Sequence, residues 1–263
     1  MTQLAVPRIS EPFRVSTARM QGFAGVFAGG AEYNPVFAHV PAMQSMVEAT
    51  QAASDRPGIH AEHDFVFHRP MAAGQTLVTE TRVTGAVCIK PGLLCRVVSV
   101  TRAGGEMVTT QVTSVLQRAV ATLPEGLNAD DVPERPEMED FAPASEAAFR
   151  IGPADVAAYA EAARDYAPYT LDAEAAKAMG FPGPVLHGMG TLGYAAQAVI
   201  AAFAGDDGTR ISKLGVRFAR PLVVAGDVDL TVVMERRGDV VLFEARTAGG
   251  DVVANRGYAE VAA

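Results

Sequence analysis

The sequence predicts an α+β protein built from two similar halves, each with a curled antiparallel sheet around one central helix. Two observations lead to this fold class. The chain repeats a series of short motifs in the same order, which indicates an internal duplication. Each half also holds one strongly apolar helical segment, followed by β-rich runs that Gly, Pro and Asp separate at hairpin spacing.

The repeat consists of three pairs of segments whose order is the same in both halves. The offset between the paired segments grows from 136 positions in the first pair to 149 in the second and 151 in the third. The pairs are residues 13–15 (FRV) with 149–151 (FRI), 35–37 (PVF) with 184–186 (PVL), and 67–70 (FHRP) with 218–221 (FARP).

The growth in offset places thirteen extra residues in the second half, between its first and second repeated segments. This insertion lies within DYAPYTLDAEAAKAMGF, and Gly29 stands roughly where the second half has Asp165. We therefore expect the second half to carry the chemistry. The first half is expected to be a degenerate copy that supports a substrate groove.

The predicted domains follow from the repeat. Residues 1–118 form the first half, residues 148–263 form the second, and residues 119–147 connect them. The connector contains four prolines and many acidic residues, which is typical of an extended linker.

Each half is expected to begin with a helix, which residues 154–163 form in the second half, after Pro153 at a favourable first position. A second helix follows at residues 190–203, and its counterpart in the first half is residues 42–53. Both helices read as apolar on nearly all sides, so they must be enclosed by other elements. A buried helix inside a curled antiparallel sheet, made twice, is a tandem or double hot-dog.

Composition narrows the class of partner. The net charge of −8 and the lack of a basic cluster argue against nucleic acid and against an anionic membrane surface. The N-terminus has no secretory signal pattern, and no segment reads as a membrane span. Cys88 and Cys95 flank a Lys-Pro-Gly turn and are expected to be reduced strand residues, so we expect a cytoplasmic protein.

Two segments of the second half resemble a known family. Residues 164–172 read RDYAPYTLD, and residues 181–188 read FPGPVLHG. These segments resemble the MaoC-like (R)-specific enoyl-CoA hydratases and 3-hydroxyacyl dehydratases, whose motif runs approximately G-D-x-N-P-x-H-x-D before a P-[IV]-[LV]-H-G segment. The F-x-R-P pattern of both halves is also similar to this family. The resemblance covers about residues 12–118 and 148–261 and implies the double hot-dog form.

The resemblance also implies roles for particular residues. Asp165 stands at the family's catalytic aspartate, and Gly188 matches the glycine whose backbone N–H donates to the oxyanion. The motif's asparagine is Ala167, and its catalytic histidine is Thr170. We expect Asp165, Gly188 and Thr170 to form the catalytic set. Residues expected to contact the substrate are Tyr166, Tyr169, His187 and Met189.

The chemistry implied is addition of water across the C2=C3 bond of an enoyl thioester. Asp165 would act as base if burial raises its pKa, and the amide of Gly188 at a helix start suits the oxyanion role. A threonine hydroxyl does not titrate near neutral pH, and loss of an acid/base partner removes about 10²–10⁴ in rate. Asp165 therefore works with water alone, or Tyr166, Tyr169 or His187 replaces the histidine. Alternatively, Asp165 only caps the local turn and helix, although Asp172 is better placed to do so.

Three functions remain open at this point. The first is a hydratase or dehydratase acting on an acyl-CoA or acyl-carrier-protein thioester. The second is a non-catalytic hot-dog that binds acyl thioesters or pairs with an active subunit, which Thr170 favours. The third is a hot-dog thioesterase. No cofactor is expected, and association into a homo-oligomer through exposed sheet edges is left open.

Three other patterns are expected to have structural roles or none. Residues 188–193 (GMGTLG) fit G-x-G-x-x-G but lack the preceding strand of a dinucleotide site, so these glycines are expected to allow tight helix packing. No metal site is expected, because His60 and His63 would face opposite sides of a regular strand. Arg69 and Arg220 could meet CoA phosphates, but we expect strand-end ion pairs, since both halves carry them.

Overall fold

The structure is a computed structural model that describes residues 6–122 and 135–262. These residues form two compact units. Unit 1 comprises residues 6–16 and 38–122, and unit 2 comprises residues 17–37 and 135–262. Residues 123–134 of the predicted connector lie outside the described residues, so the connector stays a prediction.

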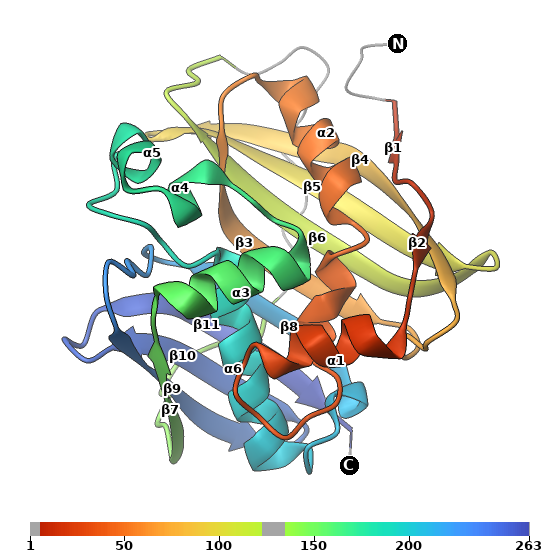
Figure 1. The fold of residues 1–263 in the computed structure, drawn as a ribbon, viewed down its shortest axis with the longest axis vertical. Helices are drawn as coiled ribbons and strands as arrows, with labels where there is room; N and C mark the ends of the chain where they lie inside the picture. Colours follow the sequence, from red (N-terminus) through yellow and green to blue (C-terminus); the bar gives the residue numbers. More distant parts are fainter. Residues whose placement is uncertain (1–5, 123–134, 263) are drawn as a thin grey trace. The chain divides into compact units, whose positions relative to one another are not determined.

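Unit 1 is an antiparallel sheet packed against one helix. The strand order is β1-β4-β5-β6-β3, with β2 also paired to β4. The helix α2 contacts β1, β4 and β5 (Figure 1). The elements are β1 (Arg8–Ile9), β2 (Phe13–Arg14), α2 (Met43–Ala53), β3 (Gly58–Phe67), β4 (Thr76–Ile89), β5 (Gly92–Ala103) and β6 (Glu106–Arg118).

Unit 2 has the same plan with more helices. Its antiparallel strands follow the order β8-β11-β10-β9-β7, and α6 lies against all five. The strands are β7 (Ser145–Ile151), β8 (Ile211–Phe218), β9 (Val228–Arg237), β10 (Val240–Thr247) and β11 (Val252–Val261). The α-helices are α1 (Thr17–Gly25), α3 (Pro153–Ala163), α4 (Pro168–Leu171), α5 (Ala173–Ala178) and α6 (Gly188–Phe203).

The predicted insertion is the pair of short helices α4 and α5. They lie between α3 and α6, and the first repeat has no α-helix between α1 and the 3-10 helix Pro35–His39. The predicted order of helices followed by four strands is confirmed in both repeats, and the extra residues of the second repeat form a distinct segment. The expectation that each half begins with a helix is wrong, because β2 precedes α1 and β7 precedes α3, where they pair with β4 and β9.

The helix α6 is buried from Met189 to Ile200, as predicted. Its glycines allow close packing. A Cβ on Gly193 would lie 2.2 Å from the ring of Phe27, and a Cβ on Gly190 would lie 2.9 Å from Leu186. Both separations are too short for a side chain, so glycine is needed where these neighbours approach the helix. The expectation that the GMGTLG glycines serve packing is confirmed.

Residues 17–37, which belong to the first repeat, supply part of the packing around α6. Phe27 contacts Tyr194 edge-on at 5.2 Å between ring centroids, and Phe23 lies 5.9 Å from Tyr159. The buried Asn34 side chain donates to the carbonyl of Gly193 at 2.9 Å. The cover of α6 is therefore assembled from both repeats.

The helix α2 differs from its prediction. Gln44, Val47 and Glu48 are exposed, while the opposite face, including Met46 and Ala49, is buried. The expectation that residues 42–53 are enclosed on nearly all sides is therefore wrong. The apolar and small residues of α2 suffice to cover one face of a sheet, and its polar residues lie in water.

The sheet of unit 1 carries an interior row of polar side chains. Thr79 and Thr101 share a hydrogen bond of 2.9 Å across β4 and β5, and Thr81 bonds Ser99 at 2.8 Å. Ser45 of α2 joins the second pair through Thr81 at 2.8 Å. These hydroxyl groups are buried, and pairing with one another removes much of the cost of their desolvation.

The histidines of β3 also depart from expectation. His60 Nε2 lies 3.0 Å from His63 Nδ1, because a bulge between His60 and Glu62 shifts the register. The expectation that these two side chains face opposite sides is wrong, since a bulge breaks strict alternation. His39 completes a cluster, with its ring centroid 5.3 Å from that of His63. Cys88 and Cys95 are free thiols on β4 and β5.

Replacing Gly193 by Ala is expected to destabilise the protein. The added methyl group meets Phe27, which is fully buried and cannot swing into solvent, so the free energy of unfolding should fall by about 1–3 kcal/mol. Chemical denaturation followed by circular dichroism measures this loss. Gly22→Ala is the matched control, because that α1 position has no atom within 4 Å of the added methyl group, and it should be neutral or stabilising. Equal stability of the two variants would contradict the packing argument.

The histidine cluster predicts acid sensitivity. Burial, and then the neighbouring His39, lower the pKa of His60 to about 3. In the unfolded chain this imidazole titrates near pH 6.5, so the unfolded state binds more protons below that pH. His60 should therefore reduce stability as the pH falls from about 6.5 towards 3, and should have no such effect above pH 7.

Thermal unfolding of the wild type and His60→Asn at pH 7.5 and pH 5 tests this expectation. The variant should lose less of its melting temperature on acidification. His68→Asn, at an exposed histidine of the same unit, should behave as the wild type. If His60→Asn lost as much of its melting temperature between pH 7.5 and pH 5 as the wild type, His60 would not be the source of the acid sensitivity.

Candidate active site

The site is built around the end of α3. Arg164 ends the helix in the left-handed conformation, with φ 56° and ψ 36°, and so turns the chain away from the helix axis. The N–H of Asp165 then donates to the carbonyl of Ala160 at 3.0 Å, which holds the next residue against the last helical turn. This C-terminal motif fixes the backbone of Asp165 although Asp165 lies outside any helix or strand.

The carboxylate of Asp165 is partly buried, with 31% of its side chain exposed. Its Oδ1 accepts a hydrogen bond of 3.3 Å from the N–H of Ala167, which forms a short turn. Asp172, not Asp165, caps α5, because its Oδ1 accepts from the N–H of Ala175 at 2.7 Å. The expected capping role of Asp172 is confirmed, and Asp165 retains lone pairs for another partner.

Thr170 lies on α4 and is buried, with 1% of its surface exposed. Its hydroxyl donates to the carbonyl of Ala167 at 2.7 Å. A hydroxyl has one proton to donate, so this internal bond leaves Oγ1 only as an acceptor for any further group. Thr170 is therefore part of the turn that holds Asp165 and Ala167.

The helix α6 begins at Gly188, directly after His187, which has the non-helical dihedrals φ −52° and ψ 140°. The first N–H groups of a helix have no intrahelical acceptor, and the helix dipole places positive charge there. A Cβ on Gly188 would lie 3.3 Å from three atoms of the Phe218 ring. Glycine thus avoids a tight contact between a side chain at this position and the Phe218 ring.

His187 connects these two segments. Its ring is almost fully buried, and its Nε2 lies 2.9 Å from the carbonyl oxygen of Asp165 and 3.8 Å from Asp165 Oδ1. Burial lowers the pKa of His187, while the charge of Asp165 and the hydrogen bond to its backbone act in the opposite direction. The imidazole is therefore neutral at neutral pH.

Two tyrosines complete the surroundings of Asp165. Burial, followed by the negative charge of Asp165, raises the pKa of Tyr169 to about 12, and the same two causes raise the pKa of Tyr159 well above its usual value. Both phenols are protonated at neutral pH. The ring centroid of Tyr159 lies 4.8 Å from that of His187, and Tyr169 packs against Phe181 at 5.7 Å.

The predicted residues separate into two groups. Asp165 and His187 are in contact, Gly188 follows His187, and Tyr169 lies within electrostatic reach of Asp165. Tyr166 is 54% exposed and donates instead to Glu161 at 2.7 Å. Met189 is buried within α6.

Tyr159 was not selected from the sequence, although it contacts His187. The repeat offered a signal, because the repeat offset of 136 pairs Tyr159 with Phe23, and the rings of these two residues lie 5.9 Å apart between centroids. Tyr159 has a hydroxyl group and Phe23 has none, so the two repeats differ at a position next to the site.

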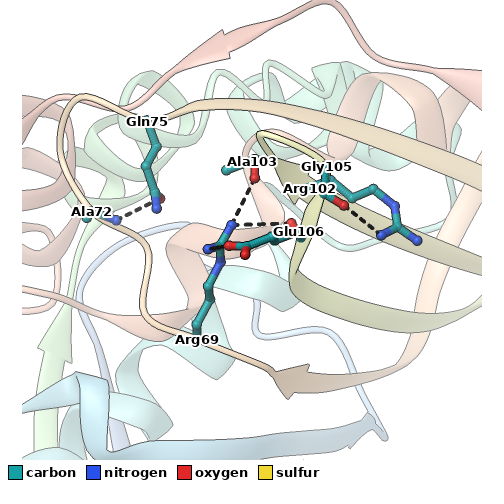
Figure 2. A network of polar contacts seen from close by, with 7 residues as sticks. All are labelled: Arg69, Ala72, Gln75, Arg102, Ala103, Gly105 and Glu106. Atoms are coloured by element: carbon teal, nitrogen blue, oxygen red, sulfur yellow. Dashed lines mark hydrogen bonds and ion pairs between the residues drawn. The ribbon is translucent and has the colours of Figure 1, made fainter.

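The two repeat-related arginines form ion pairs, as predicted. Figure 2 shows Arg69 at the end of β3, where its guanidinium pairs with Glu106 and donates to the carbonyl of Ala103 at 2.9 Å. Arg220 pairs with Asp251 in the corresponding position of unit 2. The matched ion pairs at two strand ends indicate a structural role.

Two further features of the described residues bear on the class of protein. Residues 6–122 and 135–262 contain no set of three or more His, Cys, Asp or Glu side chains arranged to bind a metal ion. None of the helices in that part of the chain combines the length and the apolar character that a membrane crossing requires.

Comparison with known proteins agrees with this architecture. Residues 134–255 match the family model described as "MaoC like domain". The resemblance predicted from the motifs is confirmed by this match.

A curated relative covers more of the chain. The chain is 29% identical over 174 residues to 3-hydroxyacyl-thioester dehydratase X of Mycobacterium tuberculosis, which is 66% of this chain and 59% of that protein. The first two curated relatives are matched over 13% and 59% of their lengths, so the chain spans less than two thirds of either.

Solved structures share the fold. The MaoC-like dehydratase of Phytophthora capsici aligns with a TM-score of 0.81 at 19% identity, over 97% of this chain and 95% of that one. A Mycobacterium tuberculosis protein described as having a double hotdog fold aligns with a TM-score of 0.61 at 13% identity, over 97% of this chain and 95% of that one. The predicted tandem hot-dog fold is confirmed.

Proposed function

We propose that the protein hydrates trans-2-enoyl thioesters or dehydrates the corresponding 3-hydroxyacyl thioesters. The observation that carries this proposal is the short link between a carboxylate and a helix start. His187 bonds the backbone of Asp165 at 2.9 Å and directly precedes Gly188. Thus a group able to accept a proton and an amide able to stabilise an anion are held by one local structure.

In the proposed reaction, Asp165 takes a proton from water as the water oxygen bonds to C3. The C2=C3 electrons move toward the thioester carbonyl, and the backbone N–H of Gly188 stabilises the enolate oxygen that forms. Protonated Asp165 then returns the proton to C2, so one water is added and the carboxylate is restored. Dehydration is the reverse sequence.

Thr170 has a supporting role in this scheme. Its proton is donated to Ala167, so the hydroxyl can accept a hydrogen bond from the reacting water but does not give it one. Tyr169, protonated and near Asp165, is a candidate contact for the thioester. Met189 and Tyr166 were also expected to bind substrate, but Tyr166 bonds Glu161.

The acyl carrier and the compartment belong to the proposal as well. The name of the relative 3-hydroxyacyl-thioester dehydratase X supports a thioester substrate, and the net charge of −8 argues against nucleic acid. Coenzyme A and acyl carrier protein remain alternative carriers, and a cytoplasmic location stays a prediction.

A second function rests on Thr170. Because its hydroxyl is committed to the turn and no imidazole stands there, a non-catalytic protein that binds acyl thioesters fits the same fold. An assay of enoyl-CoA conversion separates the enzyme from the non-catalytic binder, since the binder would retain affinity for an enoyl thioester without converting it.

The proposed reaction predicts a strong effect of replacing the carboxylate. Crotonyl-CoA and longer trans-2-enoyl-CoAs should lose their enoyl absorbance with the wild type. Asp165→Asn should lower kcat/KM by about 10²-fold or more, because the amide cannot accept the proton from water. Asp239→Asn, at an exposed carboxylate elsewhere in unit 2, is the matched control and should keep wild-type activity.

Three results would contradict the reaction. Full activity of Asp165→Asn would exclude that residue as base. Release of free thiol without loss of the enoyl group would indicate a thioesterase. Binding of every enoyl-CoA tested with no conversion would indicate the non-catalytic function.

Introducing the motif's histidine at position 170 is predicted to increase hydratase activity. Thr170→His places an acid/base group on α4 beside the turn of Asp165, and should raise kcat by about 10²-fold. The larger ring will strain a buried position, so circular dichroism must first confirm a folded protein. Asp165→Asn introduced into Thr170→His should abolish the gain. A folded Thr170→His protein with unchanged kcat would show that the site lacks more than an imidazole.

A further inference from the structure

The imidazole of His187 has a defined protonation pattern. Its Nε2 is 2.9 Å from the carbonyl oxygen of Asp165, and a carbonyl oxygen only accepts hydrogen bonds. Nε2 therefore carries the proton. Nδ1 is buried and has no hydrogen-bond partner among the described residues, so it holds a lone pair.

The same N–H group lies near a second acceptor on the same residue. Asp165 Oδ1 is 3.8 Å from Nε2, beyond hydrogen-bond distance but about 1 Å from reaching it. An ionised carboxylate is a stronger acceptor than an amide carbonyl. A small rotation of either side chain would let His187 donate to the carboxylate while it is charged.

Packing holds the ring in this place. Tyr159 of α3 lies 4.8 Å from it, at an interplanar angle of 44°. The same helix ends in the turn that holds Asp165, and the backbone of His187 continues into Gly188. His187 is thus fixed to both segments that the proposed reaction needs. It lies directly before Gly188, whereas Thr170 lies five residues after Asp165.

We propose that His187 is the positioning residue of Asp165: it orients the carboxylate but does not supply the acid/base function of the imidazole that is missing at position 170. This inference rests on the proposed function and names the partner of its base. The N–H of His187 orients the carboxylate toward the water, and the neutral ring does not exchange a proton with the substrate. The single transferred proton moves between water, Asp165 and C2.

The inference requires that the N–H, rather than the bulk of the ring, matters. Glutamine places an amide N–H at about the reach of Nε2, whereas leucine offers similar volume without a donor. His187→Leu should lower kcat about 10²-fold with little change in KM, since misplacement of a catalytic group by about 1 Å costs that much. His187→Gln should recover most of the loss.

Comparison of the two variants decides between positioning and simple packing. Equal kcat for His187→Leu and His187→Gln would overturn the proposal, as would wild-type kcat in His187→Leu. Thermal unfolding of both variants must accompany the assay. If His187→Leu fails to fold, the measurement described next decides.

A second readout does not depend on turnover. In protein labelled with ¹⁵N at histidine, NMR should show His187 as the neutral tautomer with its proton on Nε2 at pH 7. The negative charge of Asp165 raises the pKa of His187 against the lowering by burial. Asp165→Asn removes that charge, so the pKa of His187 should fall further, while Asp239→Asn should leave it unchanged.

The NMR outcomes separate failure of this inference from failure of the proposed function. A proton on Nδ1, or no response of His187 to Asp165→Asn, overturns the pairing even if the wild type is active. The expected tautomer and response in a protein that converts no enoyl-CoA would leave the pairing intact and refute the proposed reaction.

Discussion

The close packing of α6 is the constraint on which unit 2 depends. A sixteen-residue helix that is buried from its second to its thirteenth residue must be approached by neighbours on every side. Glycines make that approach feasible, because Phe27 occupies the space where a side chain on Gly193 would lie. Dense packing of this kind leaves little room for displacement of the buried turns.

The candidate site lies where this helix begins. The amide of Gly188 needs no side chain to hold it, since the burial of the following turns already fixes its direction. Polar groups at such a point must find partners within the protein, and His187 does so by donating to Asp165. The same packing thus stabilises the unit and orders its polar groups.

Much of this could be read from the sequence. The repeat, the two helices, the β-rich runs and the insertion all follow from local patterns that tertiary contacts reinforce. The ion pairs of Arg69 and Arg220 followed from their occurrence in both repeats. The roles of Asp165, Thr170 and Gly188 remain predictions, and the structure adds which atoms those residues contact.

Other features depend on tertiary context and could not be read from local pattern. A bulge after His60 brings His63 to the same side, which no alternation rule anticipates. The exposure of one face of α2 depends on what covers it, and Tyr159 acquires its place only because α3 packs beside α6. The expectations for His60, His63 and α2 were wrong because segments distant in the sequence set the environments of these residues.

The contribution of residues 17–37 to unit 2 has a consequence for how the chain is made. These residues are synthesised early, but the helix that they cover is completed some 150 residues later. During that interval Phe23 and Phe27 lack their later partners Tyr159 and Tyr194. A gene fragment cut at the repeat boundary would leave α6 with an uncovered apolar side. The first repeat therefore contributes to the unit of the second, even though each repeat has its own sheet.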